Sequence, residues 1–180
     1  MRLEPIRIDR EIHAGSGARG AFVLGDTLGM LDALVERYAN QVKLVYLDPP
    51  FLTGERFCMR VRVGEDDWRA GRGSLQLETF ADRQDRETFL AMMRRVLEAV
   101  HRMLRADGML FLHIDYRTHP YLRIMLDEIF GENNFLNEIV WVYQSGGRSL
   151  KYFSRKHDVI LFYRKGPQYD FHIESVLHPR

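Results

Sequence analysis

Residues 44–51 read LVYLDPPF, and this stretch decides the fold. Four apolar residues run directly into an acid, two prolines and an aromatic ring. A short, continuous apolar run that ends at prolines is typical of a buried strand in a parallel sheet. The polar residues then follow the carboxyl end of that strand, which is where ligands bind in open α/β sheets. The stretch therefore predicts an α/β fold with a site at residues 48–51.

The turn after this strand offers several hydrogen-bond acceptors and few hydrogen-bond donors. Pro49 and Pro50 have no N–H and a fixed φ, and Asp48 is pushed towards extended backbone because a proline follows it. Carbonyl oxygens and a carboxylate suit a substrate that donates two hydrogens from one atom, such as an exocyclic amino group. Phe51 adds a flat apolar ring. These features predict a pocket for an amino-bearing base taken out of a nucleic-acid stack.

Asp48-Pro49-Pro50-Phe51 resembles the (D/N/S)-P-P-(Y/F/W) motif of the amino-methyltransferases, which methylate adenine N6 or cytosine N4 in DNA. Further stretches resemble, in order, the group in which the Pro-Pro motif precedes the Gly-rich cofactor motif. Modification subunits of type III restriction systems belong to that group. The resemblance covers roughly residues 20–165. The stretches that carry it besides the motif are residues 25–28, 53–54, 107–115, 126–131, 137–141 and 157–163.

The resemblance implies the following chemistry. A methyl group passes from S-adenosylmethionine to the amino nitrogen by direct displacement, with one N–H held by Asp48 and the other by the Pro49 carbonyl. Phe51 stacks the flipped base, and Pro50 keeps the turn stiff. Asp26 and Asp48 are the candidate cofactor contacts. The implied partner is double-stranded DNA, and a homodimer is common in the family.

The resemblance also implies a doubly wound, mostly parallel Rossmann-like sheet with a terminal antiparallel hairpin. The expected parts are a leader at residues 1–20, a partial catalytic domain at 21–165 and a tail or the start of a recognition region at 166–180. The family's Gly-rich cofactor loop is not found downstream of the motif. We therefore expect an incomplete fold that needs a second chain or a C-terminal half carrying that loop. The alternative is a catalytically silent DNA-binding or complementing module.

Composition fits one soluble domain. The chain has 180 residues, a net charge of +1 and one cysteine, Cys58, which cannot form an internal disulfide. A reducing cytoplasm suits such a chain. The N-terminus has no apolar signal region, and no apolar run reaches membrane length.

Periodic patterns predict most of the elements. A short strand is expected at 21–24, a helix at 28–38 capped by Asp26 or Thr27, a hairpin or flap within the 52–83 insertion, a helix at 84–106, a strand at 109–114, a helix at 121–130 and two apolar strands at 135–143 and 159–163. Asp26 has two interpretations here, a helix cap and a contact to the cofactor's adenine. Asp115 is expected beside the Pro turn, because it ends the strand parallel to that of residues 44–47.

Residues 144–156 form a basic loop with two aromatics and no acid. Its four cations could track DNA phosphates. The alternative is a solvated hairpin connection. The candidate DNA contacts are Arg148, Lys151, Arg155 and Lys156.

The sequence also offers residues for two other types of site. His113, Asp115 and His157 could form a two-His-one-carboxylate iron site, but a satisfied core His113 and a strand-terminal Asp115 explain the residues without a metal. Cys58 could be a nucleophile, but it lies several residues from the Pro turn, and a small apolar filler fits its position better. We therefore expect no metal.

Overall fold

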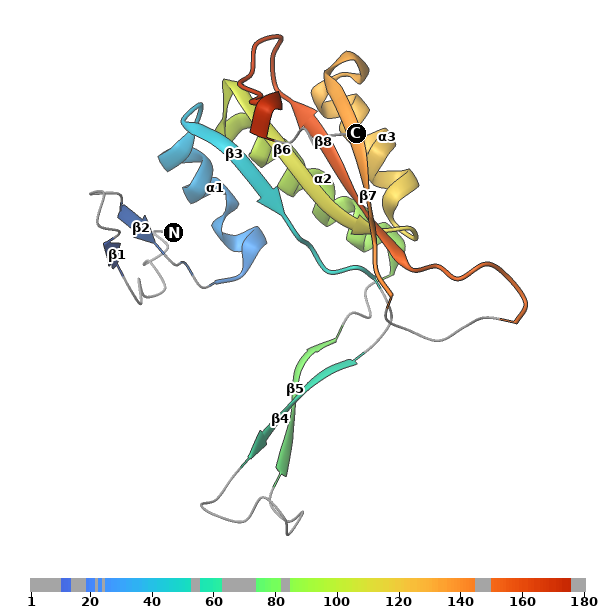
Figure 1. Ribbon diagram of the computed structural model, residues 1–180. Coiled ribbons are helices and arrows are strands. Elements are labelled where there is room, and N and C mark those ends of the chain that lie inside the picture. Colours follow the sequence, from blue (N-terminus) through green and yellow to red (C-terminus); the bar gives the residue numbers. More distant parts are fainter. Residues whose placement is uncertain are drawn as a thin grey trace.

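The computed structural model describes residues 11–13, 19–21, 23, 25–52, 56–62, 74–81, 85–144 and 150–175, and side chains within 23, 25–52, 85–144 and 150–174. At its centre is a four-stranded sheet in the order β3-β6-β8-β7 (Figure 1). Strand β3 is parallel to β6, whereas β8 is antiparallel to both β6 and β7. The strands are β3 (Val42–Leu47), β6 (Leu104–Asp115), β7 (Phe135–Val142) and β8 (His157–Arg164).

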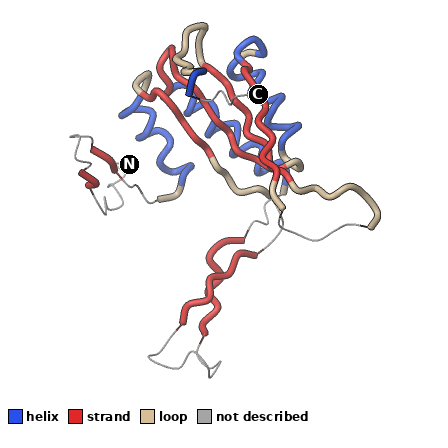
Figure 2. The backbone as a smooth tube through the Cα atoms, viewed as in Figure 1, coloured by secondary structure: helices blue, strands red, loops and turns tan. Residues whose placement is uncertain are grey.

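Three helices cover one face of this sheet (Figures 1 and 2). They are α1 (Thr27–Tyr38), α2 (Arg86–Met103) and α3 (His119–Phe130). Alternate residues of β6 and β8 face the helices and are fully buried, among them Leu110, Leu112 and Leu161. The α/β class and the terminal antiparallel strand pair are confirmed, and the described helices form one layer of the expected architecture.

Local signals explain where the helices begin and end. Asp26 caps α1 by accepting the Gly29 N–H at 2.7 Å, and Asp85 caps α2 by accepting the Thr88 N–H at 2.9 Å. Helix α3 ends at Gly131, whose φ of 89° suits a residue without Cβ. Two short 3₁₀ turns, η1 (Glu132–Asn134) and η2 (Ile173–Ser175), follow later in the chain.

The end of α2 differs from the prediction. The helix stops at Met103, and Leu104 is already extended and paired with Val42 of β3. Backbone N–H groups of Asn40 and Gln41 donate to the carbonyls of Arg102 and Met103, so these groups end the helix through tertiary contacts. Residues 105–108 then bulge out before regular pairing resumes. The helix predicted to residue 106 is therefore too long, and the strand begins five residues before 109.

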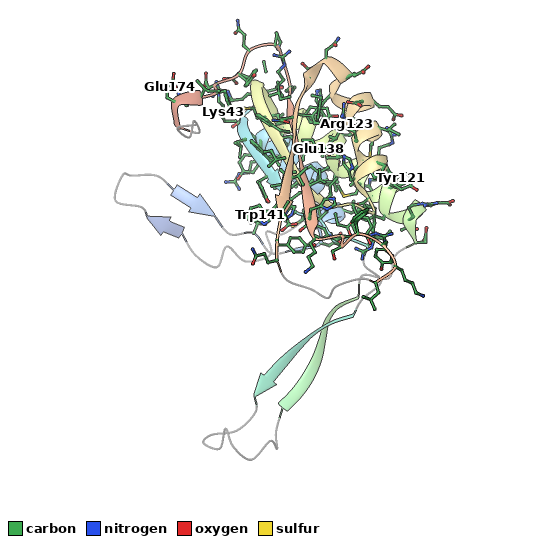
Figure 3. All side chains as sticks on the ribbon, turned by 45° about the vertical axis from the view of Figure 1, so that its right-hand side comes forward. Lys43, Tyr121, Arg123, Glu138, Trp141 and Glu174 are labelled. Atoms are coloured by element: carbon green, nitrogen blue, oxygen red, sulfur yellow. The ribbon has the colours of Figure 1, made fainter. Side chains whose placement is uncertain are left out.

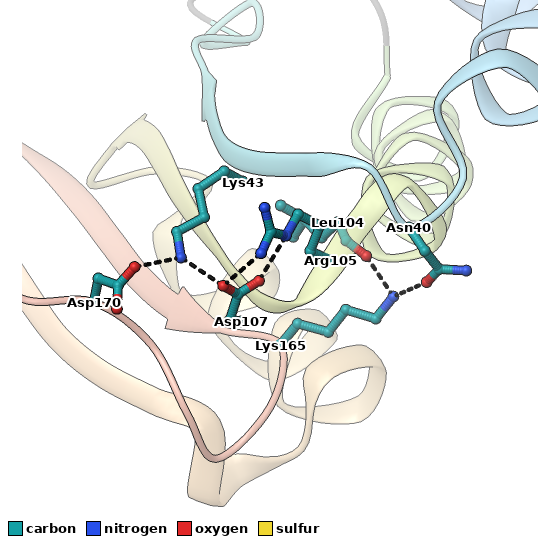
Figure 4. A network of polar contacts seen from close by, with 7 residues as sticks. All are labelled: Asn40, Lys43, Leu104, Arg105, Asp107, Lys165 and Asp170. Atoms are coloured by element: carbon teal, nitrogen blue, oxygen red, sulfur yellow. Dashed lines mark hydrogen bonds and ion pairs between the residues drawn. The ribbon is translucent and has the colours of Figure 1, made fainter.

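A polar network holds this bulge at the amino end of β3 (Figure 4). Lys43 Nζ contacts Asp107 at 2.6 Å and Asp170 at 2.7 Å. Lys165 Nζ donates to the Leu104 carbonyl at 2.7 Å. Gly108 has no room for a Cβ, which would lie 2.9 Å from the Arg105 carbonyl oxygen. These contacts lie at the opposite end of the sheet from residues 48–51.

The second face of the sheet carries no α-helix among the described residues. Leu44 and Tyr46 on β3 are 50% and 53% exposed. The prediction of a fully buried strand is therefore wrong for one face of β3, because this strand lies at the edge of the described sheet and the helices pack only on the other face.

Two smaller hairpins complete the described structure. The predicted hairpin within 52–83 is confirmed as β4 (Arg56–Arg62) paired antiparallel with β5 (Ser74–Ala81). Near the N-terminus, β1 (Glu11–His13) pairs with β2 (Arg19–Ala21). Of the strand predicted at 21–24, Ala21 lies in β2 and Val23 has no regular structure, whereas residues 22 and 24 lie outside the described residues. The Cys58 side chain also lies outside them.

Candidate active site

The Pro turn follows β3 at the carboxyl end of the parallel pair. Leu47 of β3 pairs with Leu112 of β6. Because the two strands are parallel, the residues that follow them, Asp48 and His113, also lie next to each other. The distance from Asp48 Oδ1 to His113 Nδ1 is 3.5 Å. The Asp48 side chain is 57% exposed, whereas that of His113 is only 18% exposed. The turn thus presents an accessible carboxylate with an imidazole behind it.

Aromatic rings surround this imidazole. Phe51 meets it edge-on with ring centroids 5.2 Å apart, and Tyr46 lies 6.2 Å away. Trp141 of β7 stacks towards it at 6.5 Å with an interplanar angle of 24°. Figure 3 places Trp141 near the end of the sheet from which the β7–β8 connection leaves. Flat rings beside an exposed carboxylate are the components of a stacking site for a planar, amino-bearing group.

A second carboxylate, Asp158 at the start of β8, closes the back of the site. Its Oδ2 lies 3.5 Å from His113 Nε2. Tyr143 lies close to it, and burial, followed by the charges of Asp158 and Asp115, raises the pKa of the Tyr143 hydroxyl. Burial, followed by the charge of Asp48, likewise raises the pKa of Tyr46. Both phenols therefore stay neutral hydrogen-bonding groups at the edge of the site.

Asp115 ends β6 as predicted, and its place beside the Pro turn stays a prediction. It is two residues beyond His113, is buried, and forms an ion pair with Arg117. Its Oδ1 also accepts the N–H groups of Arg117 and Thr118 just before α3. Asp115 therefore organises the loop between β6 and α3.

His113 and Asp158 are the site residues that sequence reasoning missed. The sequence favoured a core role for His113 and gave Asp158 no role. No local signal in the sequence gives their position: residues 44–47 pair with 109–112 only after the bulge in β6, and this register places His113 opposite Asp48. Among the described residues, no group of three or more His, Cys, Asp and Glu could hold a metal ion.

Asp26 begins α1, and α1 runs antiparallel to β3 because only a short turn joins them. The N-terminus of α1 therefore lies towards the same end of the sheet as Asp48 (Figure 1). The helix-cap interpretation of Asp26 is confirmed by its bond to Gly29, and its role towards a cofactor stays a prediction.

The basic loop joins β7 to β8 at this same end. Its last residues precede the Val142–His157 pair and the Trp141–Asp158 pair. Arg155 is exposed, donates to the Tyr116 hydroxyl at 3.2 Å and lies over the Tyr116 and Tyr152 rings. Lys156 donates to the Gln144 carbonyl at 3.3 Å, and Lys151 is exposed. Arg148 lies outside the described residues.

Comparison with known proteins identifies the family. A family model described as DNA methylase matches residues 42–180. The chain belongs to this DNA methylase family. The match includes the Pro turn and the strands that surround it, so the expected family is confirmed.

Two relatives illustrate how much of a methylase this chain spans. It is 30% identical over 128 residues to the type III restriction-modification enzyme StyLTI Mod subunit of Salmonella typhimurium, covering 67% of this chain and 20% of that protein. It is 31% identical over 150 residues to the type II methyltransferase M.EcaI of Enterobacter cloacae, covering 83% of this chain and 30% of that protein. The chain therefore spans less than a third of the length of these relatives.

The fold of this methylase chain is similar to that of the PvuII DNA methyltransferase (cytosine-N4-specific). The TM-score is 0.56 at 14% identity, over 89% of this chain and 54% of that one. Among the described helices, none is long and apolar enough to cross a membrane.

Proposed function

We propose that this chain carries the catalytic turn of a site-specific DNA methyltransferase of a restriction-modification system. The reaction moves a methyl group from S-adenosylmethionine to the exocyclic amino group of a flipped adenine (N6) or cytosine (N4). The observation that carries the proposal is the exposed Asp48 carboxylate at the end of β3, with Phe51 packed against the same imidazole, in a chain of the DNA methylase family. This function implies a cytoplasmic location.

The turn acts by holding and orienting the base. Asp48 and the Pro49 carbonyl each accept one N–H of the amino group, which turns the nitrogen lone pair towards the incoming methyl group. Positioned hydrogen-bond acceptors of this kind lower a barrier because they are already in place when the charge changes. Phe51 stacks on the base, and Pro50 restricts the backbone. After transfer, the amino nitrogen loses one proton.

The described residues fit one side of a cofactor site. When bound, S-adenosylmethionine supplies a methyl group on a positively charged sulfur. Asp48 offers a negative charge on the same turn that would hold the base. Asp26 is exposed, and one of its oxygens accepts from Gly29, so the carboxylate is already oriented at the helix end. These two acids are the candidates for contacts to the cofactor.

We further propose that a second chain segment with the Gly-rich loop completes the site. Two features of β3 support this. Among the described residues, no strand pairs with its outer edge. The apolar side chains of Leu44 and Tyr46 lie exposed on the face without helices. Pairing along this edge and cover over this face would bury both side chains. A homodimer is a further arrangement to test by light scattering.

The division into parts is also a proposal. We assign residues 21–165 to the partial catalytic domain, with a flap at 52–83 and the DNA loop at 144–156. We assign residues 166–180 to a tail or to the start of a recognition region. Limited proteolysis with mass spectrometry would test these boundaries.

The deciding experiment measures methyl transfer. The purified chain is incubated with duplex DNA and S-[methyl-³H]adenosylmethionine, alone and mixed with a fragment that carries the Gly-rich motif. We expect incorporation into adenine or cytosine in one of these conditions. Asp48→Ala should reduce it at least about 100-fold with an unchanged circular dichroism spectrum, whereas Asp32→Ala, which removes an exposed acid from α1, should not.

Two outcomes would contradict the proposal. Near-normal transfer by Asp48→Ala would remove the turn from the mechanism. DNA binding without transfer in either condition would favour the silent module. Calorimetric titration of S-adenosylmethionine into the chain, with Asp26→Ala compared, separates cofactor binding from catalysis.

A further inference from the structure

We propose that His113 is a positioning residue that fixes the Asp48 carboxylate for methyl transfer. This inference rests on the proposed function, because it assigns the group that orients the proposed acceptor. His113 lies behind Asp48 on the neighbouring strand and is itself held between two acids and three aromatic rings.

The two ring nitrogens face different carboxylates. Nδ1 lies 3.5 Å from Asp48 Oδ1, and Nε2 lies 3.5 Å from Asp158 Oδ2. The three side chains come from three elements, the turn after β3, the middle strand β6 and the start of β8. His113 Nε2 is buried, and among the described side chains it has no hydrogen-bond partner. A buried polar nitrogen without a hydrogen-bond partner needs an explanation, and a role in the chemistry of the site is one.

The aromatic rings limit how the imidazole can turn. Phe51 contacts it edge-on, Tyr46 lies tilted beside it, and Trp141 stacks towards its face. The stacked pair Phe111 and Phe162, with centroids 4.3 Å apart, lies on the same face of the sheet, two residues before His113 on β6 and two residues after its partner Ile160 on β8. Rotation of His113 would break these contacts, so its Nδ1 keeps its direction towards the Pro turn.

In this geometry the two oxygens of the Asp48 carboxylate have different hydrogen-bond partners. When Nδ1 carries its proton, it donates to Oδ1, and Oδ2 remains for the amino group of the base. Hydrogen bonds at such sites are often long before the substrate binds and shorten in the reactive complex. Without His113, the exposed Asp48 side chain could rotate, and the acceptor would spend less time in the productive direction. Asp158 Oδ2 faces the other ring nitrogen at 3.5 Å, and a ring that carries a proton on both nitrogens can donate to both acids at once.

A pair of amide variants tests the role of each nitrogen. The amide nitrogen of Asn reaches about as far as Nδ1, and that of Gln about as far as Nε2. His113→Asn therefore keeps a donor towards Asp48, whereas His113→Gln moves it towards Asp158. We expect kcat to fall about tenfold or more for His113→Gln and only a few-fold for His113→Asn. KM for DNA and for S-adenosylmethionine should change little for either, and His172→Gln, on an exposed histidine, is the matched control.

A second experiment does not depend on methyl transfer. It tests the proposal even if the variants fold poorly or the wild-type chain transfers no methyl group. Nitrogen-15 NMR of the wild-type chain reports the state of both His113 ring nitrogens. We expect the Nδ1 resonance to move in Asp48→Asn and the Nε2 resonance to move in Asp158→Asn, with the His172 signals unchanged in both.

The outcomes are distinct. An unchanged kcat in His113→Gln would overturn the role of His113 in positioning Asp48. So would an Nδ1 resonance that does not move in Asp48→Asn. Absence of transfer by the wild-type chain and by its mixture with the Gly-rich fragment would overturn the proposed function instead. In that case the NMR result alone decides whether His113 orients Asp48.

Discussion

The ammonium group of Lys43 lies 2.6 Å from a carboxylate oxygen of Asp107. This contact joins β3 to the bulge that begins β6, and Lys43 also contacts Asp170. The hydrogen bond from Lys43 lowers the pKa of Asp107 and that of Asp170. The same bonds, from Asp107 first, raise the pKa of Lys43.

These shifts predict an acid-dependent loss of stability. A carboxyl whose pKa is lower in the folded state stabilises the fold fully above its unfolded pKa of about 3.9, and this contribution disappears as the pH falls through the folded pKa. We therefore expect the free energy of unfolding to decrease from about pH 4 downwards. Urea titrations at several pH values measure it.

The matched comparison is Asp107→Asn against Asp32→Asn, an exposed acid on α1. The first variant should show a flatter pH dependence, and the second should follow the wild type. Because the cluster is exposed, added salt should also weaken the effect. An unchanged acid slope in Asp107→Asn would contradict this assignment.

The two faces of the sheet predict different responses to the same substitution. Leu112 faces the helices and is fully buried, whereas Leu44 is 50% exposed on the other face. Leu112→Ala should lower the free energy of unfolding by about 2–5 kcal/mol because it leaves a cavity. Leu44→Ala should change it by about 0.5 kcal/mol or less.

The second half of this prediction concerns the proposed partner segment. If that segment covers the exposed face, Leu44→Ala should weaken its binding while the isolated chain keeps its stability. Denaturant titration and a pull-down with the Gly-rich fragment measure the two effects separately. Equal destabilisation by both variants would show that the exposed face already belongs to the core.

The elements that the sequence predicted well are those with a local signal. The apolar spacing of α2 and α3, the caps Asp26 and Gly131, and the hairpin after the Pro turn all depend on neighbouring residues. The end of α2 does not depend on neighbouring residues, because its last carbonyl oxygens accept hydrogen bonds from the backbone N–H groups of residues 40 and 41. Residues 104–106 have a helical pattern, and only the pairing of Leu104 with Val42 shows that they leave the helix.

The site was predicted in part for the same reason. The acid, prolines and aromatic ring of the turn are contiguous and carry their own chemistry. His113 reaches Asp48 only through the strand register, and that register follows a bulge whose length has no clear signal in the sequence. The helix predicted at 121–130 begins two residues earlier, at His119, and Tyr121 is 40% exposed and accepts a bond from Arg86.

The hydroxyl oxygen of Tyr163 should contribute to the free energy of unfolding. Its side chain is fully buried on β8, accepts from Arg123 Nε at 2.7 Å and donates to Asp127 Oδ1 at 2.6 Å. Burial raises the pKa of this hydroxyl, so it stays protonated and keeps donating. Tyr163→Phe should cost about 1–3 kcal/mol because it leaves two polar groups of α3 without this partner.

The control for this substitution is Tyr46→Phe, which removes a hydroxyl from a half-exposed ring. Thermal and urea unfolding should show a change of about 0.5 kcal/mol or less for it. A Tyr163→Phe variant as stable as the wild type would mean that the ion pair between Arg123 and Asp127, 3.2 Å apart within α3, satisfies both groups without the hydroxyl.

The basic loop predicts the salt dependence of DNA binding. Each side chain that neutralises a phosphate contributes a slope of about −0.9 to the plot of log K against log salt. Arg155→Ala and Lys156→Ala should therefore each reduce the slope by about one and weaken binding to all sequences alike. The measurement is fluorescence anisotropy of a labelled duplex titrated at four or more salt concentrations.

Arg94→Ala provides the matched control, because it removes the same charge from α2, where Arg94 is paired with Glu128 at 2.5 Å. Its slope should equal that of the wild type, since α2 packs on the helical face of the sheet (Figure 1) and Arg94 is already paired with an acid there. Equal losses in all three variants would indicate a response to net charge alone. Unchanged slopes in Arg155→Ala and Lys156→Ala would make the loop a solvated connection, and DNA contacts would then have to come from other parts of the chain.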